Sequence, residues 1–177
     1  KWRGDLTFTQ SPFCEIDNLI LSCLSYVDFD DIVPEHLGAV TVAEASAVYF
    51  GKHSDEEIEN YRPFLHSAPF LLKEMAKSKR FGKAELMHYT NKISAGRELQ
   101  FSAIEIFLGD GTSYIAFRGT DDTIVGWRED FNMSIGNVPS EHMAAEYLSQ
   151  TGSFSRHMLR VGGHSKGGHL ALYAAAK

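Results

Sequence analysis

Near its carboxyl end the chain reads Gly162-Gly163-His164-Ser165-Lys166-Gly167-Gly168, which contains a G-x-S-x-G pattern centred on Ser165. A short run, Met158-Leu159-Arg160-Val161, precedes it, and a helix-like apolar run from Leu170 to Lys177 follows it. A strand before this pattern and a helix after it are the context in which it forms a sharp turn that exposes the serine hydroxyl. We therefore predict such a turn at Ser165. Gly163 and Gly167 are expected where side chains would collide with the neighbouring strand and helix.

A second motif stands upstream, where the strand-like run from Tyr114 ends in Phe117-Arg118-Gly119-Thr120. Acyl-transfer sites built around such a serine turn need a second N–H donor from a loop that follows another strand. Gly119-Thr120 is separated from Ser165 by about one strand–helix unit, which suits that requirement.

The region from 1 to 82 is expected to be mostly helical. One predicted helix has an apolar face at helical spacing, formed by Ile16, Leu19, Ile20, Cys23, Leu24 and Val27. A capping box at Thr41–Glu44 predicts a helix start, and a second capping box at Ser54–Glu57 is expected to open a short acidic turn. A further helix is predicted from Ala68 to Arg80, with Lys77, Lys79 and Arg80 placed to suit the dipole at its end.

From 83 to 177 the spacing of apolar residues is no longer helical, and this region is expected to form the sheet core. Strands are expected over 86–93, 100–108 and 113–118, and Gly109-Asp110-Gly111-Thr112 predicts a hairpin between the last two. Ser140 is expected to cap a helix whose inner face carries Met143, Ala144, Tyr147 and Leu148. Because strands and helices alternate, we predict an α/β fold with a mainly parallel sheet flanked by helices.

Composition narrows the class of protein. The 177 residues are 44% hydrophobic and 23% charged, as in an ordinary soluble domain, and a net charge of −6 excludes a basic nucleic-acid footprint. No apolar stretch is long enough to span a membrane.

Two cysteines do not form a disulfide framework, and the motifs of metal and cofactor sites do not occur, so we predict neither metal nor cofactor. Without a signal-peptide pattern the sequence favours the cytoplasm, although it begins at Lys1. It leaves the oligomeric state open.

Together these motifs resemble the α/β-hydrolase superfamily. The segment from roughly Phe101 to Lys177 is similar to the fungal-type (class 3) lipases. The similarity is carried by Phe117-Arg118-Gly119-Thr120, by Trp127 and Asp130, and by the serine motif. The whole chain resembles an uncharacterised, lipase-like bacterial family, which shares the opening Trp2-Arg3-Gly4-Asp5-Leu6 and the segment Asp17-Asn18-Leu19-Ile20-Leu21-Ser22.

This resemblance implies a serine hydrolase of lipase or esterase type that acts on a small-molecule ester or lipid. It implies that Ser165 is the nucleophile and that the backbone N–H groups of Lys166 and Thr120 form the oxyanion hole. The segment from Asp121 to about Asn137 would correspond to a lid, with Trp127 and Phe131 as lid or core residues. Thioesters, amides or peptides are alternative substrates, and a non-catalytic interaction protein with the same fold is the alternative outside enzymology.

The chain departs from the family in two respects. Lys166 stands where class 3 lipases usually have an apolar residue, so it either points to water or favours an anionic acyl or head group. A serine nucleophile also needs a histidine and an acid, which follow it in this fold. No acid follows Ser165. We expect His169 to face inward or beside the sheet, and we assign His164 no catalytic role. The acid and histidine are therefore expected beyond Lys177, so that residues 1–177 form the N-terminal part of one longer α/β-hydrolase domain with little turnover alone.

Overall fold

The computed structural model describes residues 3–61, 67–94, 96, 99–120, 138–154 and 157–177. In this part a five-stranded mixed sheet runs in chain order, β1 (Val40–Thr41), β2 (Glu85–Ser94), β3 (Leu99–Phe107), β4 (Thr112–Phe117) and β5 (Met158–Gly163). The helices are α1 (Glu15–Leu24), α2 (Val42–Lys52), α3 (Asp55–Tyr61), α4 (Ala68–Ala76), α6 (Pro139–Phe154) and α7 (Lys166–Ala176). Before residue 82 the described elements are the helices α1 to α4 and the two-residue strand β1, and the fold class is α/β.

The prediction of a mainly parallel sheet is wrong for the described strands. β1–β2, β2–β3 and β3–β4 pair antiparallel, and only β4 and β5 pair in parallel. The cause lies in the connections, because a tight hairpin can only return a strand antiparallel to its neighbour. Gly109 and Gly111 form that hairpin with φ values of 77° and 85°. The longer connection through α6 allows β5 to run parallel to β4.

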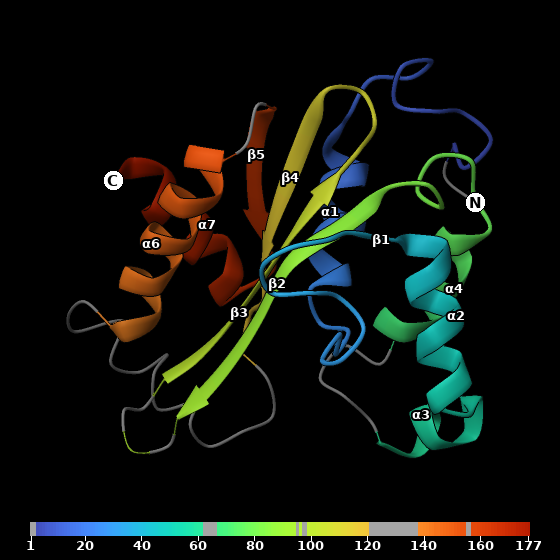
Figure 1. Ribbon diagram of the computed structural model, residues 1–177, viewed down its shortest axis with the longest axis horizontal. Helices are drawn as coiled ribbons and strands as arrows, with labels where there is room; N and C mark the ends of the chain where they lie inside the picture. Colours follow the sequence, from blue (N-terminus) through green and yellow to red (C-terminus); the bar gives the residue numbers. More distant parts are fainter. Residues whose placement is uncertain (1–2, 62–66, 95, 97–98, 121–137, 155–156) are drawn as a thin grey trace.

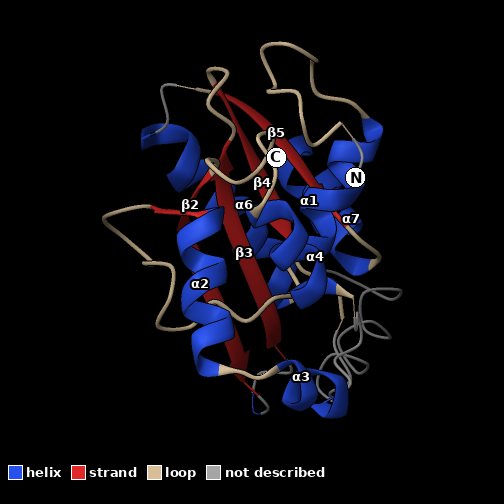
Figure 2. Ribbon diagram, turned by 90° about the vertical axis from the view of Figure 1, so that its right-hand side faces the viewer, coloured by secondary structure: helices blue, strands red, loops and turns tan. Residues whose placement is uncertain are grey.

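Helices cover both faces of the sheet. Figures 1 and 2 show α1, α2 and α4 on one face and α6 and α7 on the other. The strands alternate between two cores accordingly: Tyr114 and Ala116 of β4 pack with the first set of helices, and Ile115 and Phe117 pack with the second. β4 is fully buried along its length, so the loop that follows it leaves the centre of the molecule.

The buried face of α1 differs from the prediction. Leu21 and Leu24 are buried, whereas Ile16 and Leu19 are 38% and 55% exposed. The polar residues Asp17 and Ser22 occupy inward positions because they have partners there. The helix begins at Glu15. Periodicity alone could not show this, since the partners lie far away in the chain.

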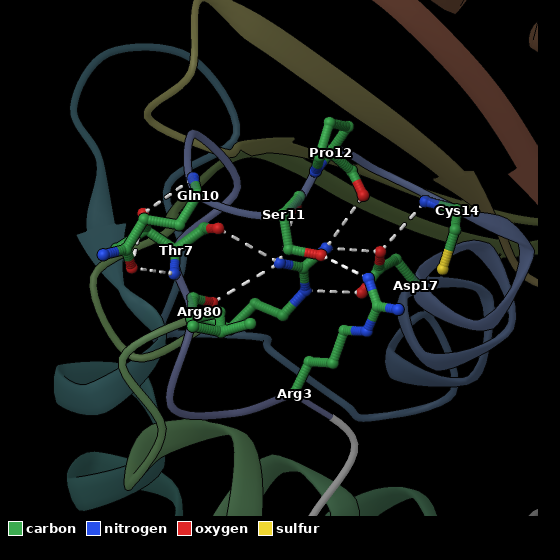
Figure 3. Close-up of polar contacts among 9 residues, drawn as sticks. Arg3, Thr7, Gln10, Ser11, Pro12, Cys14, Asp17 and Arg80 are labelled. Carbon is green, nitrogen blue, oxygen red and sulfur yellow. Dashed lines mark hydrogen bonds and ion pairs between the residues drawn. The ribbon is translucent and has the colours of Figure 1, made fainter.

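Arg80 is the partner of Asp17 and the centre of a buried polar cluster (Figure 3). Its Nε and Nη2 donate to the two carboxylate oxygens of Asp17 over 2.7 and 2.6 Å, and both side chains are fully buried. Nη1 donates to the carbonyl of Ser11 over 2.9 Å, and the guanidinium lies 4.0 Å from the centre of the Phe8 ring. The predicted role of Arg80 at a helix end is therefore wrong, because α4 ends at Ala76 and Arg80 fastens the segment before α1.

Local signals for helix starts gave mixed results. Both capping boxes are confirmed, with Glu44 N–H donating to Thr41 Oγ1 over 3.2 Å and Glu57 N–H donating to Ser54 Oγ over 3.2 Å. The prediction that Ser140 caps α6 is wrong: the helix begins at Pro139, and the N–H of Val138 donates to the Glu141 carboxylate over 3.0 Å. Glu141 thus accepts a bond at the helix start, where the prediction places a serine cap.

Candidate active site

Ser165 lies between β5 and α7 in a backbone conformation that is uncommon for a residue with a side chain. Its φ is 57° and its ψ is −127°, and it is the N-cap residue of α7. Its side chain is exposed. Non-glycine residues with positive φ are strained, and such strain gathers at functional sites. The predicted sharp turn is thus present at the predicted serine.

The two flanking glycines are required by the packing of this turn. A Cβ on Gly163 would lie 2.5 Å from the carbonyl oxygen of Gly167 and 2.6 Å from that of Phe117. A Cβ on Gly167 would overlap the Phe117 carbonyl oxygen and approach the carbonyl carbon of Arg118 to 3.0 Å. The turn therefore packs backbone to backbone against the end of β4, as expected from the motif.

The parallel pairing of β4 and β5 brings the two sequence motifs together. Phe117 and Gly163 are register partners at the ends of their strands, so both following loops leave the same edge of the sheet. A Cβ on Gly119 would lie 2.5 Å from the carbonyl oxygen of His164, which places the Phe117–Thr120 loop beside the serine turn. Thr120 is buried, and Lys166 is the first residue of α7. N–H groups in the first turn of a helix have no partner within the helix and favour negative charge.

The side chain of Lys166 does not point to water. It is 6% exposed, and its Nζ donates to the carbonyl oxygen of Gln100 over 3.0 Å. The ammonium thus fastens the start of α7 to the start of β3. This geometry also gives no support to the alternative that Lys166 selects an anionic acyl or head group.

Tyr26 contacts both loops of the candidate site and was not found from the sequence. Its hydroxyl lies 3.1 Å from Nδ1 of His164, and a Cβ on Gly119 would collide with that hydroxyl. His164 is thereby held by a residue that follows α1. No sequence signal marks Tyr26, because the contact joins residues far apart in the chain.

His169 does not face inward, which is one of the two positions expected for it. Its side chain is 47% exposed, and its Nε2 lies 2.7 Å from Oε1 of Glu141, the same buried carboxylate that accepts the N–H of Val138. Among the residues that the structure describes, the Ser165 hydroxyl has no hydrogen bond to a histidine. The described part of the site therefore contains a candidate nucleophile and candidate oxyanion donors.

Other predicted features lie elsewhere. Trp127, Asp130, Phe131 and the lid segment 121–137 fall outside the described residues. Ser165 lines neither of two cavities, of about 500 and 600 Å³, that described residues enclose. Within the described ranges, no three His, Cys, Asp or Glu side chains come together to hold a metal ion. No helix in those ranges has the length and apolar character to cross a bilayer.

Comparison with known proteins identifies the family. Searches of curated proteins and of solved structures gave no match. A family model described as Mbeg1-like matches residues 75–177, more than half of the chain, and the match includes β2 to β5, α6, α7 and the serine turn. The chain therefore belongs to the Mbeg1-like family.

Proposed function

We propose that this protein is a serine hydrolase of lipase or esterase type with Ser165 as its nucleophile. The observation that carries the proposal is the strained conformation of an exposed serine at the start of α7. Glycines that admit no side chain surround it, and the loop after β4 lies against it. This is the arrangement that acyl transfer requires.

The proposed reaction follows from that arrangement. The Ser165 oxygen attacks an ester carbonyl carbon, and the carbonyl oxygen becomes an oxyanion. We place that oxyanion against the backbone N–H groups of Lys166 and Thr120, where the dipole of α7 adds to its stabilisation. The alcohol then leaves, and water hydrolyses the acyl-enzyme to release a carboxylic acid and restore the serine.

A serine also needs a base to take its proton. His164 and His169 are engaged by Tyr26 and Glu141, and neither is bonded to the Ser165 hydroxyl. We therefore assign the base, with its orienting acid, to groups outside the described residues. The substrate in this proposal is a small-molecule ester or a lipid, which are the esters that the lipase resemblance implies.

The proposal is tested with a fluorophosphonate probe, which reacts with activated serines. We expect one adduct per chain, located on Ser165 by mass spectrometry and abolished in Ser165→Ala. Ser149→Ala, which removes an exposed serine on α6, is the matched control and keeps the adduct. Absence of labelling in the complete protein would overturn the proposal and favour a non-catalytic interaction protein.

Substrate class needs a second measurement on the labelled protein. Matched p-nitrophenyl esters, thioesters and anilides of the same acyl group separate the esterase assignment from thioesterase and amidase activity. We expect the ester to be cleaved with the highest kcat/KM. A thioester or anilide cleaved more efficiently would keep the Ser165 mechanism and replace the substrate class.

A further inference from the structure

Arg118 is a buried cation directly before the Gly119-Thr120 loop. It is 9% exposed, and its Nε is buried without a hydrogen-bond partner among the described residues. A buried charge is costly unless it is paired and fully hydrogen-bonded. The reaction proposed at Ser165 gives this guanidinium no step of its own. What it does follows from its contacts and from its place beside Thr120.

The sheet stops holding the chain where this loop begins. Phe117 is the last residue of β4, and the pairings of β4 with β3 and with β5 both end there. The N–H of Arg118 donates one more backbone bond, to the carbonyl oxygen of Ser102 over 2.9 Å. The position of the Thr120 N–H, two residues further along, therefore depends on contacts outside the strand ladder. An oxyanion donor is effective only when it is held in place before the reaction.

The side chain of Arg118 supplies one of these contacts. Phe117 packs with α6 and α7, so the alternation of the strand turns the next residue toward the face of α1. There, Nη2 of Arg118 donates to Oδ1 of Asn91 over 2.9 Å. Asn91 lies on β2, and β3 stands between β2 and β4. The guanidinium therefore spans β3 and ties the end of β4 to β2.

Asn91 connects this tie to the loop that follows α1. Its Nδ2 donates to Oδ2 of Asp30 over 3.2 Å, so the amide accepts from a cation at one end and donates to a carboxylate at the other. Four residues before Asp30, the hydroxyl of Tyr26 lies where a Cβ on Gly119 would stand. The loop after α1 thus fixes the end of β4 at two points, directly through Tyr26 and indirectly through Asn91.

The charges around Arg118 favour a role inside the fold over capture of an anion. Asp28 and Asp30 are exposed acids of the loop after α1, and Oδ1 of Asp28 lies 3.5 Å from the Tyr89 hydroxyl. Burial raises the pKa of Tyr89 to about 12, and the Arg118 charge opposes this rise, which places the guanidinium in the same group. The two acids offset the Arg118 charge at longer range and would repel a second anion.

We propose that Arg118 is a positioning residue that holds the Thr120 N–H in the oxyanion hole through Asn91. This role rests on the proposed function at Ser165 and adds a requirement to it. Without the Arg118–Asn91 bond the loop after β4 shifts, and the donor leaves the place where the oxyanion forms. An interaction made only in the transition state contributes to kcat and not to substrate binding, so its loss lowers kcat and spares KM.

The test compares kcat and KM for a p-nitrophenyl ester in variants of the complete protein. Arg118→Met keeps an apolar stem and removes the guanidinium, and we expect kcat to fall about 100-fold while KM changes less than about threefold. Asn91→Leu has a similar shape and removes the acceptor, and we expect it to lower kcat about tenfold.

Arg160→Met is the matched control. Arg160 lies half-buried on β5, 4.8 Å from the centre of the Phe13 ring, and its Nη1 is also buried without a partner in the part of the chain that the structure describes. It does not precede the Thr120 loop, so we expect Arg160→Met to leave kcat unchanged. A loss of kcat as large as that of Arg118→Met would overturn the assignment.

The double variant Arg118→Met/Asn91→Leu shows whether the two residues act as one unit. If Arg118 acts through Asn91, the double variant loses no more kcat than Arg118→Met alone. Independent effects would multiply to about 1,000-fold, and this result would contradict the tie through Asn91.

Fluorophosphonate labelling of the wild-type protein separates the two levels of the proposal. Absence of labelling removes the hydrolase itself, whereas a labelled wild type with unchanged kcat in Arg118→Met removes only the role of Arg118. Thermal unfolding is measured for each variant. If Arg118→Met does not unfold cooperatively, Asn91→Leu decides alone, and an unchanged kcat in that variant rejects the positioning role.

Discussion

The serine turn and the Arg80 cluster are held in opposite ways. At the turn, Gly163 and Gly167 let three backbone segments touch, and the structure depends on the absence of side chains. In the cluster, one long side chain reaches Asp17 and the carbonyls of residues 6, 7, 11 and 12, and the structure depends on its presence. The comparison teaches that a site packed through its backbone can be recognised from a short sequence motif. A cluster around one side chain cannot, because its members are distant in the sequence.

Removal of the Arg80 guanidinium is expected to have the largest effect on stability. Arg80→Met leaves the Asp17 carboxylate buried without its partner, which costs about 3–5 kcal/mol of unfolding free energy. Urea unfolding monitored by circular dichroism measures this loss. Lys77→Ala breaks an exposed pair with Glu74 and is expected to cost at most about 1 kcal/mol. Equal losses in the two variants would show that the buried Arg80–Asp17 pair stabilises the fold no more than an exposed ion pair does.

A methyl group at Gly167 tests the backbone-packed site. Gly167→Ala forces the Phe117 carbonyl to move, and we expect a loss of about 2 kcal/mol together with loss of fluorophosphonate labelling. Gly51→Ala is the matched control, because α2 is open around that glycine, and it is expected to gain about 0.5–1 kcal/mol. A Gly167→Ala variant as stable as Gly51→Ala would contradict the close contact between Gly167 and the Phe117 carbonyl.

The same contrast explains which features could be predicted from the sequence. The hairpin at Gly109–Thr112 and the cap at Thr41 depend on neighbours within a few residues, and local patterns predicted them. The turn at Ser165 also packs against the end of β4, but glycines on both sides of the serine mark it in the local sequence. The inward position of Asp17 and the burial of Lys166 depend on Arg80 and on the Gln100 carbonyl, which are more than sixty residues away. Hydrophobic periodicity assigns such polar residues to the surface, and only the tertiary partner reverses the assignment.

The direction of the sheet was missed for a related reason. The single parallel pair among the described strands, β4 with β5, is the one that forms the candidate site, and it follows from the helix between the two strands. The pairings of β2 with β3 and of β3 with β4 depend on short connections, whose effect the alternation of strands and helices does not show. The turn at Ser165 could therefore be predicted more fully than the sheet that carries it.

Acidification is expected to weaken the side-chain hub before it affects the turn. Burial alone would raise the pKa of Asp17, but the hydrogen bonds and charge of Arg80 outweigh it and hold that pKa below its ordinary value of 3.8. A carboxyl group whose pKa is lower in the folded state contributes stability above its ordinary pKa, and this contribution is lost as the pH falls through the folded value. We expect the urea midpoint of unfolding to fall as the pH is lowered below about 3.8. Asp17→Asn, which cannot titrate, flattens this dependence, and an unchanged slope would contradict the assignment.

The smallest expected effect concerns the strain at Ser165. Glycine adopts positive φ without cost, so Ser165→Gly releases the strain and is expected to raise the unfolding free energy by about 1 kcal/mol. Ser165→Ala keeps a Cβ in the same conformation and is expected to change stability by less than about 0.5 kcal/mol. Both variants lose the labelled hydroxyl, so labelling cannot separate them and thermal unfolding must. A gain that is specific to glycine would mean that the turn keeps its serine at a cost in stability, as a site selected for chemistry would; equal stabilities would place the Ser165 conformation among ordinary turns.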